Sequence, residues 1–359
     1  MKKLTPLLPF IICVLLAGCA GPRTVSPQGN SLEIQRETEK QRQLSYGRFV
    51  KDQTHLFDVT FPILKNNAAF CSKFARPLYG LTIWNTEIVP AKYKSTVKAL
   101  YHLTPEITVQ HVTKNSPASQ AGLKPGDVFV SINGEPLAEG KAGFEHAKTL
   151  IKQSAYRTIE IYYKRKHDVF SALLTPIKGC NIPVLLENKS AINAYADGKK
   201  IVLTRGIMRF TESKDELALV IAHELAHNTM DHISKKQQNT IAGTLGGFAI
   251  DSLLAAAGVS TGNQFSKMGS QYGNLAHSVA FEQEADYVGM YFMARAGYDT
   301  TQVANFWRRM ASEGGASIDH ARTHPTSPQR FLAIERTHSE IRLKQRNHQK
   351  LHPNLKPQR

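Results

Sequence analysis

Apolar and polar residues follow one another along this chain in patterns that predict both strands and helices. Thr108–Val112 alternates between the two kinds of residue, which predicts a strand. Asn193–Ala196 and Lys200–Thr204 flank an Asp-Gly pair, and this arrangement predicts a β-hairpin. Glu216–His227 is mostly apolar and rich in strong helix formers, so we expect it to form a buried helix.

The N-terminus has the pattern of a secretory signal. Two lysines precede an apolar stretch from Leu7 to Leu16, which is too short to span a bilayer stably. The Leu-Ala-Gly before Cys19 resembles a bacterial lipobox, which implies cleavage at that point and lipidation of the thiol. Ala20 in the next position then implies the outer membrane, with the protein facing the periplasm. An ordinary signal peptide with a fortuitous cysteine is the alternative.

The cysteines fit this location. Cys13 would leave with the signal peptide, and Cys19 would carry the lipid. Cys71 and Cys180 remain as an even pair in an oxidising compartment, so we predict a disulfide between them. Such a bond would clamp the two ends of the middle region to the rest of the molecule. Two buried free thiols are the alternative.

The predicted buried helix contains the sequence His223-Glu224-Leu225-Ala226-His227. Residues four apart lie on one face of a helix, so His223 and His227 can hold one Zn²⁺ between two imidazoles. Glu224 lies beside that face and can reach a metal-bound water. The pattern predicts one zinc per chain and a hydrolase, in the first instance a protease. A buried helix that carries two histidines by chance is the alternative.

A zinc site of this kind needs a third protein ligand. One zincin pattern needs a His six residues and a Gly three residues beyond the second His, and Ile233 and Met230 stand there instead. His232 is one position away, and we expect it to face elsewhere on a helix.

A later segment offers a carboxylate as the third ligand. Glu282 and Asp286 are four residues apart and share a helix face, whereas Glu284 is rotated by about 200° and points away. We predict that Glu282 binds zinc and that Asp286 accepts the outer N–H of a ligand histidine. A solvated acidic helix face is the alternative.

These two motifs resemble those of the HtpX and BepA-like zinc metalloproteases, relatives of the CAAX prenyl proteases. The resemblance extends over roughly Cys180 to Glu340 and implies that Glu282 is a ligand and Asp286 a supporting residue. A third family element, a His-Pro followed by an Arg, matches His324 and Arg330. It implies that His324 can approach the zinc in a resting state and that Arg330 lies near the substrate cleft. A loop histidine before a proline is the alternative for His324.

The middle of the chain resembles a PDZ domain in the segment Ser116–Gly134, S-P-A-S-Q-A-G-L-K-P-G-D-V-F-V-S-I-N-G. A helix over Gly143–Gln153 and a strand over Thr158–Lys164 follow in the order of that fold. Pro77–Ile83 matches the loop that binds a peptide carboxylate and the strand beside it. The resemblance implies that Gly80, Leu81 and Thr82 carry the binding N–H groups. The insertion Asn85–Thr104 is longer than usual and puts access to the groove in doubt, so a purely structural domain is the alternative.

Two further regions are compositionally unusual. Thr240–Val259 is rich in Ala and Gly with one charge, Asp251, and lies between the two helices expected to bind zinc. We expect a pair of core or lid helices covering the active site there, with membrane contact as the alternative. The formal net charge is +16, and the tail from Arg336 to Arg359 is basic with Glu340 as its one acidic residue. The positive charge suggests contact with anionic lipid or acidic partners, whereas the secretory signal argues against nucleic acid. We expect the basic tail itself to be solvated and disordered.

Together these features predict an α+β protein with a PDZ-like β-rich domain, followed by a mostly helical zincin metalloprotease domain (gluzincin type) with a small sheet. The domains we expect are a signal peptide (1–18), a lipid-anchored tether with a short N-terminal helix (19–73), the PDZ-like domain (74–176), the protease domain (180–340) and a basic tail (341–359).

The predicted mechanism assigns Glu224 as the general base and Arg330 or a backbone donor as the oxyanion stabiliser. By resemblance, Tyr195 and Ala196 lie on an edge strand that aligns a peptide, and the substrates are misfolded envelope or outer-membrane proteins. The rival is a non-catalytic chaperone or adaptor with structural zinc, which a closed site that includes His324 would favour. Nothing resembles a glycan-binding module, which disfavours an enzyme acting on peptidoglycan.

Overall fold

The computed structural model describes residues 24–275, 278–312 and 327–356. The expected signal peptide, Cys19 and His324 lie outside the described residues. The helices are α2 (Ser31–Asn66), η1 (Ala68–Phe70), η2 (Ser72–Phe74), η3 (Ala91–Tyr93), α3 (Lys94–Tyr101), α4 (Pro117–Gln120), α5 (Gly140–Gln153), α6 (Arg205–Phe210), α7 (Lys214–Thr229), α8 (His232–Ala256), α9 (Gln264–Leu275), α10 (Ser278–Arg295), α11 (Val303–Ser312) and α13 (Pro328–Arg346). The strands are β1 (Ala75–Leu78), β2 (Leu81–Trp84), β3 (Thr108–Val112), β4 (Val128–Ile132), β5 (Glu135–Pro136), β6 (Ile159–Arg165), β7 (Asp168–Leu174), β8 (Ile177–Cys180), β9 (Val184–Glu187), β10 (Ala194–Ala196) and β11 (Ile201–Thr204).

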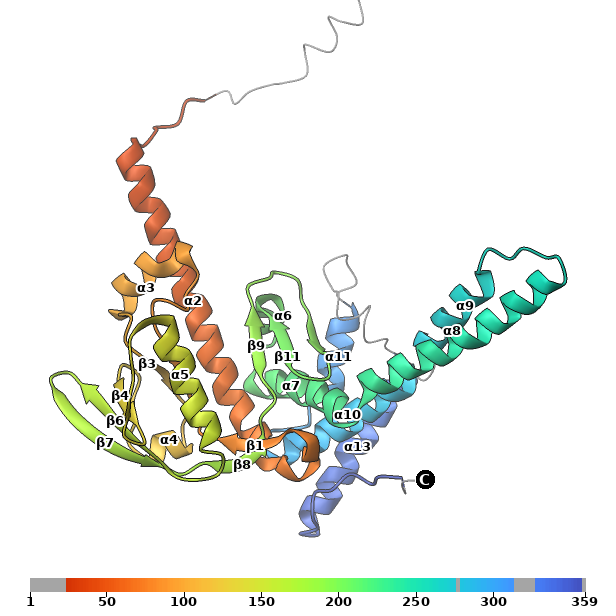
Figure 1. Cartoon of the computed structure of the whole chain (residues 1–359). Helices are drawn as coiled ribbons and strands as arrows, with labels where there is room; N and C mark the ends of the chain where they lie inside the picture. Colours follow the sequence, from red (N-terminus) through yellow and green to blue (C-terminus); the bar gives the residue numbers. More distant parts are fainter. Residues whose placement is uncertain (1–23, 276–277, 313–326, 357–359) are drawn as a thin grey trace, which may run out of the picture.

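A long N-terminal helix, α2, runs between the β-rich domain and the helical domain (Figure 1). It starts at a capping box, in which Asn30 accepts from the backbone of Glu33 and the Glu33 side chain accepts in return. We expected only a short helix in this region. The helix is 36 residues long because its second half buries apolar side chains, from Leu56 to Leu64, in the core of the helical domain.

The β-rich domain is built on an antiparallel sheet with strand order β2-β3-β4-β6-β7, to which β5 pairs at β4. The three elements expected here are present: Thr108–Val112 is β3, Gly143–Gln153 lies within α5, and Thr158–Lys164 overlaps β6. Its core consists of apolar side chains from the sheet and from α4 and α5. The sequence therefore predicted this domain's elements well.

The insertion between β2 and β3 binds this domain to α2. η3 and α3 lie within it, and Trp84, Val89 and Val97 pack there with Tyr46 and Val50 of α2. The insertion thus has a structural role, because it forms a small apolar core of its own against the long helix.

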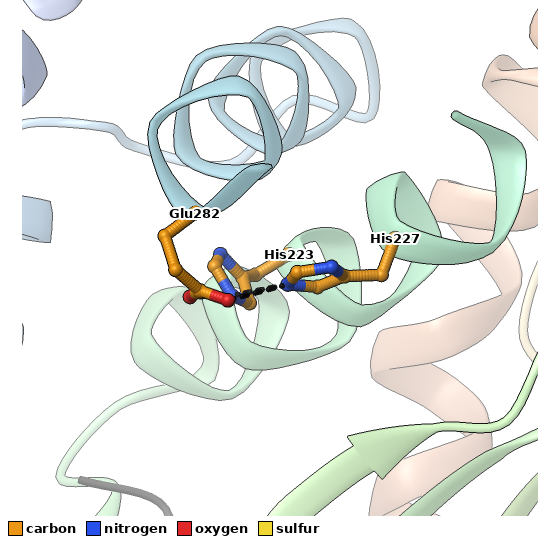
Figure 2. A group of neighbouring side chains, drawn as sticks. All are labelled: His223, His227 and Glu282. Atoms are coloured by element: carbon orange, nitrogen blue, oxygen red, sulfur yellow. Dashed lines mark hydrogen bonds and ion pairs between the residues drawn. The ribbon is translucent and has the colours of Figure 1, made fainter. Parts of the chain in front are cut away.

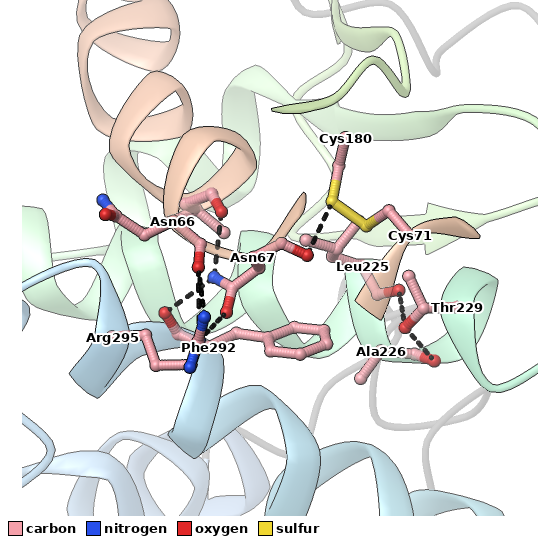
Figure 3. The surroundings of a disulfide bond; sticks show 10 residues. Asn66, Asn67, Cys71, Cys180, Leu225, Ala226, Thr229, Phe292 and Arg295 are labelled. Atoms are coloured by element: carbon pink, nitrogen blue, oxygen red, sulfur yellow. Dashed lines mark hydrogen bonds between the residues drawn. A yellow bond between two sulfur atoms is a disulfide. The ribbon is translucent and has the colours of Figure 1, made fainter. Parts of the chain in front are cut away.

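A two-stranded ribbon of β1 and β8 links the two domains, with Ala75 paired to Cys180. A disulfide joins Cys180 to Cys71 across a sequence separation of 109 residues (Figure 3). Beside it, the side-chain amide of Asn67 donates to the backbone carbonyl of Phe292 in α10 at 3.0 Å. The Arg295 guanidinium donates to the side-chain oxygen of Asn67. The end of α2 is therefore fastened both to the ribbon and to α10.

The helical domain has a small sheet with strand order β10-β11-β9. β10 and β11 form the antiparallel hairpin predicted around the Asp-Gly pair, and β9 pairs in parallel with β11. β10 and β9 lie at the two edges of this sheet. Helices α7 and α10 pack together in the core, which α11, α13 and the end of α2 complete.

The segment Thr240–Val259, which we expected to cover the active site, lies mostly in a projecting helix. α8 and α9 pack on each other and project from the molecule as a two-helix arm (Figure 1). Of the α8 side chains only His232 and Asp251 are buried, together with Gly247. The lid expectation was wrong for most of this segment, because a glycine seam makes the helices pair with each other. No described helix is long and apolar enough to cross a membrane.

The C-terminal segment is also more ordered than expected. α13 continues to Arg346, beyond the expected domain end, and the chain then folds back so that the Asn354 backbone donates to the Tyr287 hydroxyl at 3.0 Å. The Arg295 guanidinium donates to the carbonyl of Leu351. The disordered tail predicted from the basic composition was therefore wrong for residues 341–356, because specific hydrogen bonds hold them against α10.

Candidate metal centre

The central helix of the site, α7, is buried on every side. Ser213 caps its N-terminus by accepting from the Glu216 backbone, and every residue from Glu216 to Asn228 is buried. This explains why the sequence is apolar throughout and not only along one stripe. His223 and His227 are thereby carried into the interior on a rigid element.

Three side chains from two helices converge on one point. His223 and His227 extend from α7, and Glu282 reaches them from α10 (Figure 2). The two Nε2 atoms are 3.1 Å apart, and the Glu282 oxygens lie 3.3 Å from that of His223 and 3.4 Å from that of His227. The structure therefore brings together the three residues that the sequence proposed as ligands.

The spacing of these atoms fits a zinc ion. Zn–N and Zn–O bonds of about 2.0–2.1 Å in a tetrahedron put ligand atoms about 3.3–3.4 Å apart. The observed separations of 3.1, 3.3 and 3.4 Å agree with that geometry. The donor set of two imidazoles and one carboxylate is that of a catalytic zinc site with a fourth position for water.

The electrostatics of the cluster also favour a cation. Burial opposes a charge on His223, yet Asp286 and Glu282 beside it raise the pKa of this imidazole to about 9. Two buried carboxylates thus hold a proton on a ring that would ordinarily lose it near neutrality. A bound Zn²⁺ would supply the positive charge in place of that proton.

Asp286 supports His223 from behind. Its Oδ1 lies 3.0 Å from Nδ1 of His223, so this carboxylate fixes the ring with Nε2 directed at the cluster. Burial would raise the pKa of Asp286, but the charges of Arg330 and His223 hold it below its usual value. Asp286 therefore stays ionised in the core.

Arg330 is buried beside the candidate ligands. Its side chain is fully buried, donates from Nη2 to Asp286 at 3.0 Å and stacks over Trp307. Its Nη1 also lies 3.5 Å from Glu282, which lines the cavity described below. Arg330 therefore contacts two carboxylates of the site, and its proposed part in stabilising an oxyanion stays a prediction.

A residue that sequence reasoning set aside lies behind the second histidine. Nδ1 of His232 is 3.0 Å from Nδ1 of His227, and its Nε2 is 2.8 Å from Glu284. This hydrogen bond from His232 is the main reason why the pKa of Glu284 is lowered. Both ligand histidines are therefore backed by a carboxylate, His223 directly and His227 through a second imidazole.

Close packing of α10 on α7 depends on a glycine. A Cβ placed on Gly289 would lie 3.1 Å from both the Cα and the backbone N of His223. A Cβ contact this short is tighter than most, so a side chain at this position would push apart the helices that carry Glu282 and His223 by a few tenths of an ångström. The sequence signal was a glycine inside an apolar helix, which often marks close backbone contact.

A cavity of about 530 Å³ opens beside the cluster. Its walls come from α7, α8, α10 and the edge strand β10, and are formed by Tyr195, Ala196, Glu224, His227, His232, Ile233, Lys236, Gln237, Thr240, Ile241, Ser278, Phe281 and Glu282. Glu224 is 1% exposed and faces this space next to the ligands. The cavity therefore lies between β10, the candidate ligands His227 and Glu282, and Glu224.

The residues predicted to bind a peptide carboxylate lie elsewhere. Gly80, Leu81 and Thr82 line a separate cavity of about 240 Å³, bounded by α2 and by the segment from Asn181 to Val184. Gly80 has a φ of +71°, which a residue with a side chain would strain to adopt. The loop therefore turns at Gly80 and faces α2 and the connection to β9, and its binding of a peptide carboxylate stays a prediction.

Comparison with known proteins agrees with this division. Residues 166–338 match the model of peptidase family M48, and residues 108–165 match the model of the PDZ domain. The matches confirm the resemblance to zinc metalloproteases, the PDZ resemblance of the segment Ser116–Gly134 and the predicted α+β class, in which a PDZ-like β region precedes a helical metalloprotease domain.

Two curated relatives illustrate the similarity. The chain is 35% identical over 157 residues to the mitochondrial metalloendopeptidase OMA1 of Schizosaccharomyces pombe, an alignment covering 42% of this chain and 45% of that protein. It is 32% identical over 136 residues to the beta-barrel assembly-enhancing protease of Yersinia pestis, covering 36% of this chain and 28% of that one. The chain thus spans less than half the length of these relatives. A crystal structure of the HtrA3 PDZ domain with a phage-derived ligand is 24% identical, with a TM-score of 0.22, and covers 29% of this chain and 88% of that one.

Proposed function

We propose that this chain, which matches peptidase family M48 and the PDZ domain, is a zinc-dependent endopeptidase of the bacterial envelope. The observation that carries the proposal is the cluster of His223, His227 and Glu282, which opens on a cavity with Glu224 in its wall. A structural zinc site would be closed by a fourth protein ligand and would have no use for Glu224. Within the described residues, which exclude His324, the cluster opens on a cavity, and this supports the enzyme over the adaptor.

The residues divide the chemical work. When bound, zinc would lower the pKa of a coordinated water to about 7 and polarise the scissile carbonyl. Glu224 takes the proton of the attacking water and returns it to the leaving amine. Asp286 and Arg330 keep His223 and Glu282 in place during this exchange, since both are buried and hydrogen-bonded behind the ligands.

An extended polypeptide is the substrate that the cavity fits. β10 lies at an edge of its sheet, and Tyr195 and Ala196 line the cavity, so a substrate strand can run alongside it. We propose that the PDZ-like loop at Gly80–Thr82 recognises polypeptide C-termini or regulates access. We further propose misfolded envelope or outer-membrane proteins as substrates, which the name of the beta-barrel assembly-enhancing protease supports.

The proposed location is the periplasmic face of the outer membrane, with Cys19 lipidated. It rests on the lipobox-like sequence before Cys19 and on the beta-barrel assembly that the name of the bacterial relatives mentions. Labelling with a radioactive fatty acid, with Cys19→Ser as the control, tests the anchor independently of catalysis.

The test of the activity is the fate of an unfolded polypeptide incubated with the zinc-loaded protein. We expect internal cleavage, seen as fragments by mass spectrometry, which stops on chelation and returns when zinc is restored. Cleavage that ignores the chelator, or trimming from the ends alone, would contradict a zinc endopeptidase.

A further inference from the structure

The two-helix arm formed by α8 and α9 has no place in the proposed catalytic mechanism beyond its base. The base, from Ile233 to Ile241, lines the cavity beside the metal ligands. The distal part projects away from the rest of the molecule (Figure 1). We ask what this part is built to contact.

The helices pair without using large side chains. A Cβ on Gly243 or on Gly269 would lie 2.0 Å from the carbonyl oxygen of the other residue, and Gly247 and Gly273 meet the opposite helix equally closely. The seam therefore excludes side chains and turns the large ones outward. Asp251 closes the far end by accepting from the backbone and the hydroxyl of Ser266, at 2.8 and 2.7 Å.

Large apolar side chains consequently face outward along the arm. Ile241, Leu245 and Phe248, spaced four and three residues apart, are 59%, 63% and 59% exposed. Leu253, further along the same helix, is 73% exposed. The other exposed apolar or aromatic residues of the arm are Ile250, Val259, Met268 and Tyr272. Monomeric soluble proteins rarely expose so continuous an apolar surface without a partner.

The chemistry of the surface identifies the partner. Between Gln237 and Leu275 the only charged residues are Asp251, which is buried, and Lys267. Ile250 and Phe248 lie on opposite sides of α8, since two residues correspond to about 200° of rotation, so the distal half is apolar on more than one face. A helix that is apolar around its circumference suits a medium that surrounds it, whereas a peptide or protein partner would need one concave or flat face.

We propose that the distal half of the arm, from about Phe248 to Met268, inserts into the lipid of a bilayer. The inference rests on the proposed envelope location, in which a lipidated Cys19 brings the chain to a membrane. No described helix can cross a membrane, so insertion is limited to one leaflet, as for interfacial helices. Tyr272 stands nearer the base of the arm, where an aromatic ring suits the headgroup region.

Insertion of the arm would also fix the position of the active-site cavity relative to the bilayer. Ile241 lines the active-site cavity, and twelve residues of helix separate it from Leu253, a distance of about 18 Å. Insertion of the arm tip would therefore hold the mouth of the cavity close to the bilayer surface. The substrates favoured by such placement are polypeptide segments lying at or leaving a membrane.

The test uses a fluorophore on the arm of the full lipidated chain. Leu253→Cys is labelled with an environment-sensitive dye, and Leu173→Cys, an equally exposed leucine at 68% on β7, serves as the matched control. Both proteins are reconstituted into vesicles of phosphatidylethanolamine and phosphatidylglycerol, with and without nitroxide groups on the acyl chains. We expect the nitroxides to quench the arm label at least threefold more than the control label, and Phe248→Glu in the same chain to remove the difference.

Three results would overturn the proposal. The first is equal quenching at the two positions. The second is an apolar shift of the arm label's emission on adding an unfolded polypeptide but not on adding vesicles, which would make the arm a substrate-binding surface. The third is an apolar shift of the arm label's emission that depends on protein concentration alone, which would indicate that the arm binds a second copy of the chain. Repeating the measurement with Glu224→Gln separates this question from catalysis, because insertion requires no peptide cleavage.

Discussion

His227 and His232 form a pair of imidazoles whose hydrogen atoms can be assigned by elimination. If Nε2 of His227 gives its lone pair to zinc, Nδ1 must carry the proton and donate to Nδ1 of His232, 3.0 Å away. His232 then carries its own proton on Nε2 and donates to Glu284 at 2.8 Å. The chain of hydrogen bonds is thus consistent in one direction only, and it presents His227 to the metal in the correct tautomer.

Loss of His232 should therefore weaken the metal site. His232→Ala is expected to lower zinc affinity by about 10- to 100-fold, the range typical for groups that orient a ligand histidine. Glu284→Gln, which still accepts a hydrogen bond but lacks the charge, should cost less. Competition with a chromogenic chelator measures both.

His111→Ala is the matched control, since His111 lies on β3 of the β-rich domain and pairs with Asp58 of α2, away from the metal ligands. Recovery of zinc affinity in His232→Asn, whose amide oxygen can accept from His227, would support positioning over general destabilisation. Unchanged affinity in His232→Ala would show that His227 needs no orienting partner.

The end of α7 separates the site residues that the sequence could predict from the one that it could not. His223, Glu224 and His227 could be predicted because they lie within one helix, where spacing fixes the face. Glu282 could be predicted in the same way from its spacing to Asp286 on α10. His232 could not, because α7 ends at Thr229 and Asp231 adopts a left-handed conformation with φ of 57°. A new helix starts at His232 and returns the ring to the site, so an argument from continuous helical periodicity gave the wrong direction.

Among the elements, the contact between α7 and α10 sets the geometry of the site. Three ligand atoms from two helices must meet within a few tenths of an ångström, and Gly289 is the point of closest approach. Sequence reasoning placed both helices but not this contact, because the distance between two helices depends on side-chain packing that spacing rules do not contain.

Gly289→Ala should therefore both destabilise the fold and weaken zinc binding. The added methyl meets backbone at 3.1 Å, and overpacking of this kind costs about 1–3 kcal/mol of unfolding free energy. Gly246→Ala is the control, because a Cβ there has nothing within 4 Å and should be neutral or stabilise α8 by about 0.5–1 kcal/mol. Denaturant unfolding and zinc affinity measure the two effects, and equal results for both variants would contradict the packing argument.

The arm should loosen in acid. Burial raises the pKa of Asp251, but hydrogen bonds from Thr261, Ser266 and Phe265 overcome this and lower it to about 2, below the ordinary value of 3.8. A depressed folded pKa means that the carboxylate stabilises the arm at pH values above about 4 and that this stabilisation is lost as the pH falls toward 2. Protection of the Phe265 and Ser266 amides from hydrogen exchange, relative to an unstructured chain at the same pH, should fall over that window, and Asp251→Asn should show low protection at pH 7. High protection that stays the same across this pH range would show that the glycine seam alone holds the arm.

In the whole molecule, α2 and the disulfide make the two domains one unit. α2 contributes to the core of the helical domain and to the small core beside the β-rich domain. The bond between Cys71 and Cys180 closes a loop that contains the entire β-rich domain. Domain identity could be predicted from motifs, but this mode of connection could not, since it depends on contacts between segments far apart in the sequence.

Removal of the disulfide should lower stability without emptying the metal site. The chain-entropy estimate for a loop of 109 residues is about 4–5 kcal/mol at most, so Cys71→Ala with Cys180→Ala should unfold at a clearly lower temperature. Zinc affinity of the folded variant should stay within a few-fold of the wild type, because neither cysteine contacts the ligands. An unchanged unfolding temperature would show that α2 and the β1–β8 ribbon suffice to join the domains.

The most direct test of a zinc endopeptidase built on these residues compares the wild type with Glu224→Gln on one unfolded polypeptide. Zinc content and the cleavage rate are measured on the same preparations. We predict one zinc per chain in both proteins and a cleavage rate about 10²- to 10⁴-fold lower in the variant, since the amide keeps the shape of Glu224 but cannot accept the proton. A variant that binds zinc and cleaves at a rate close to that of the wild type would contradict the assignment of Glu224 and the mechanism built on it.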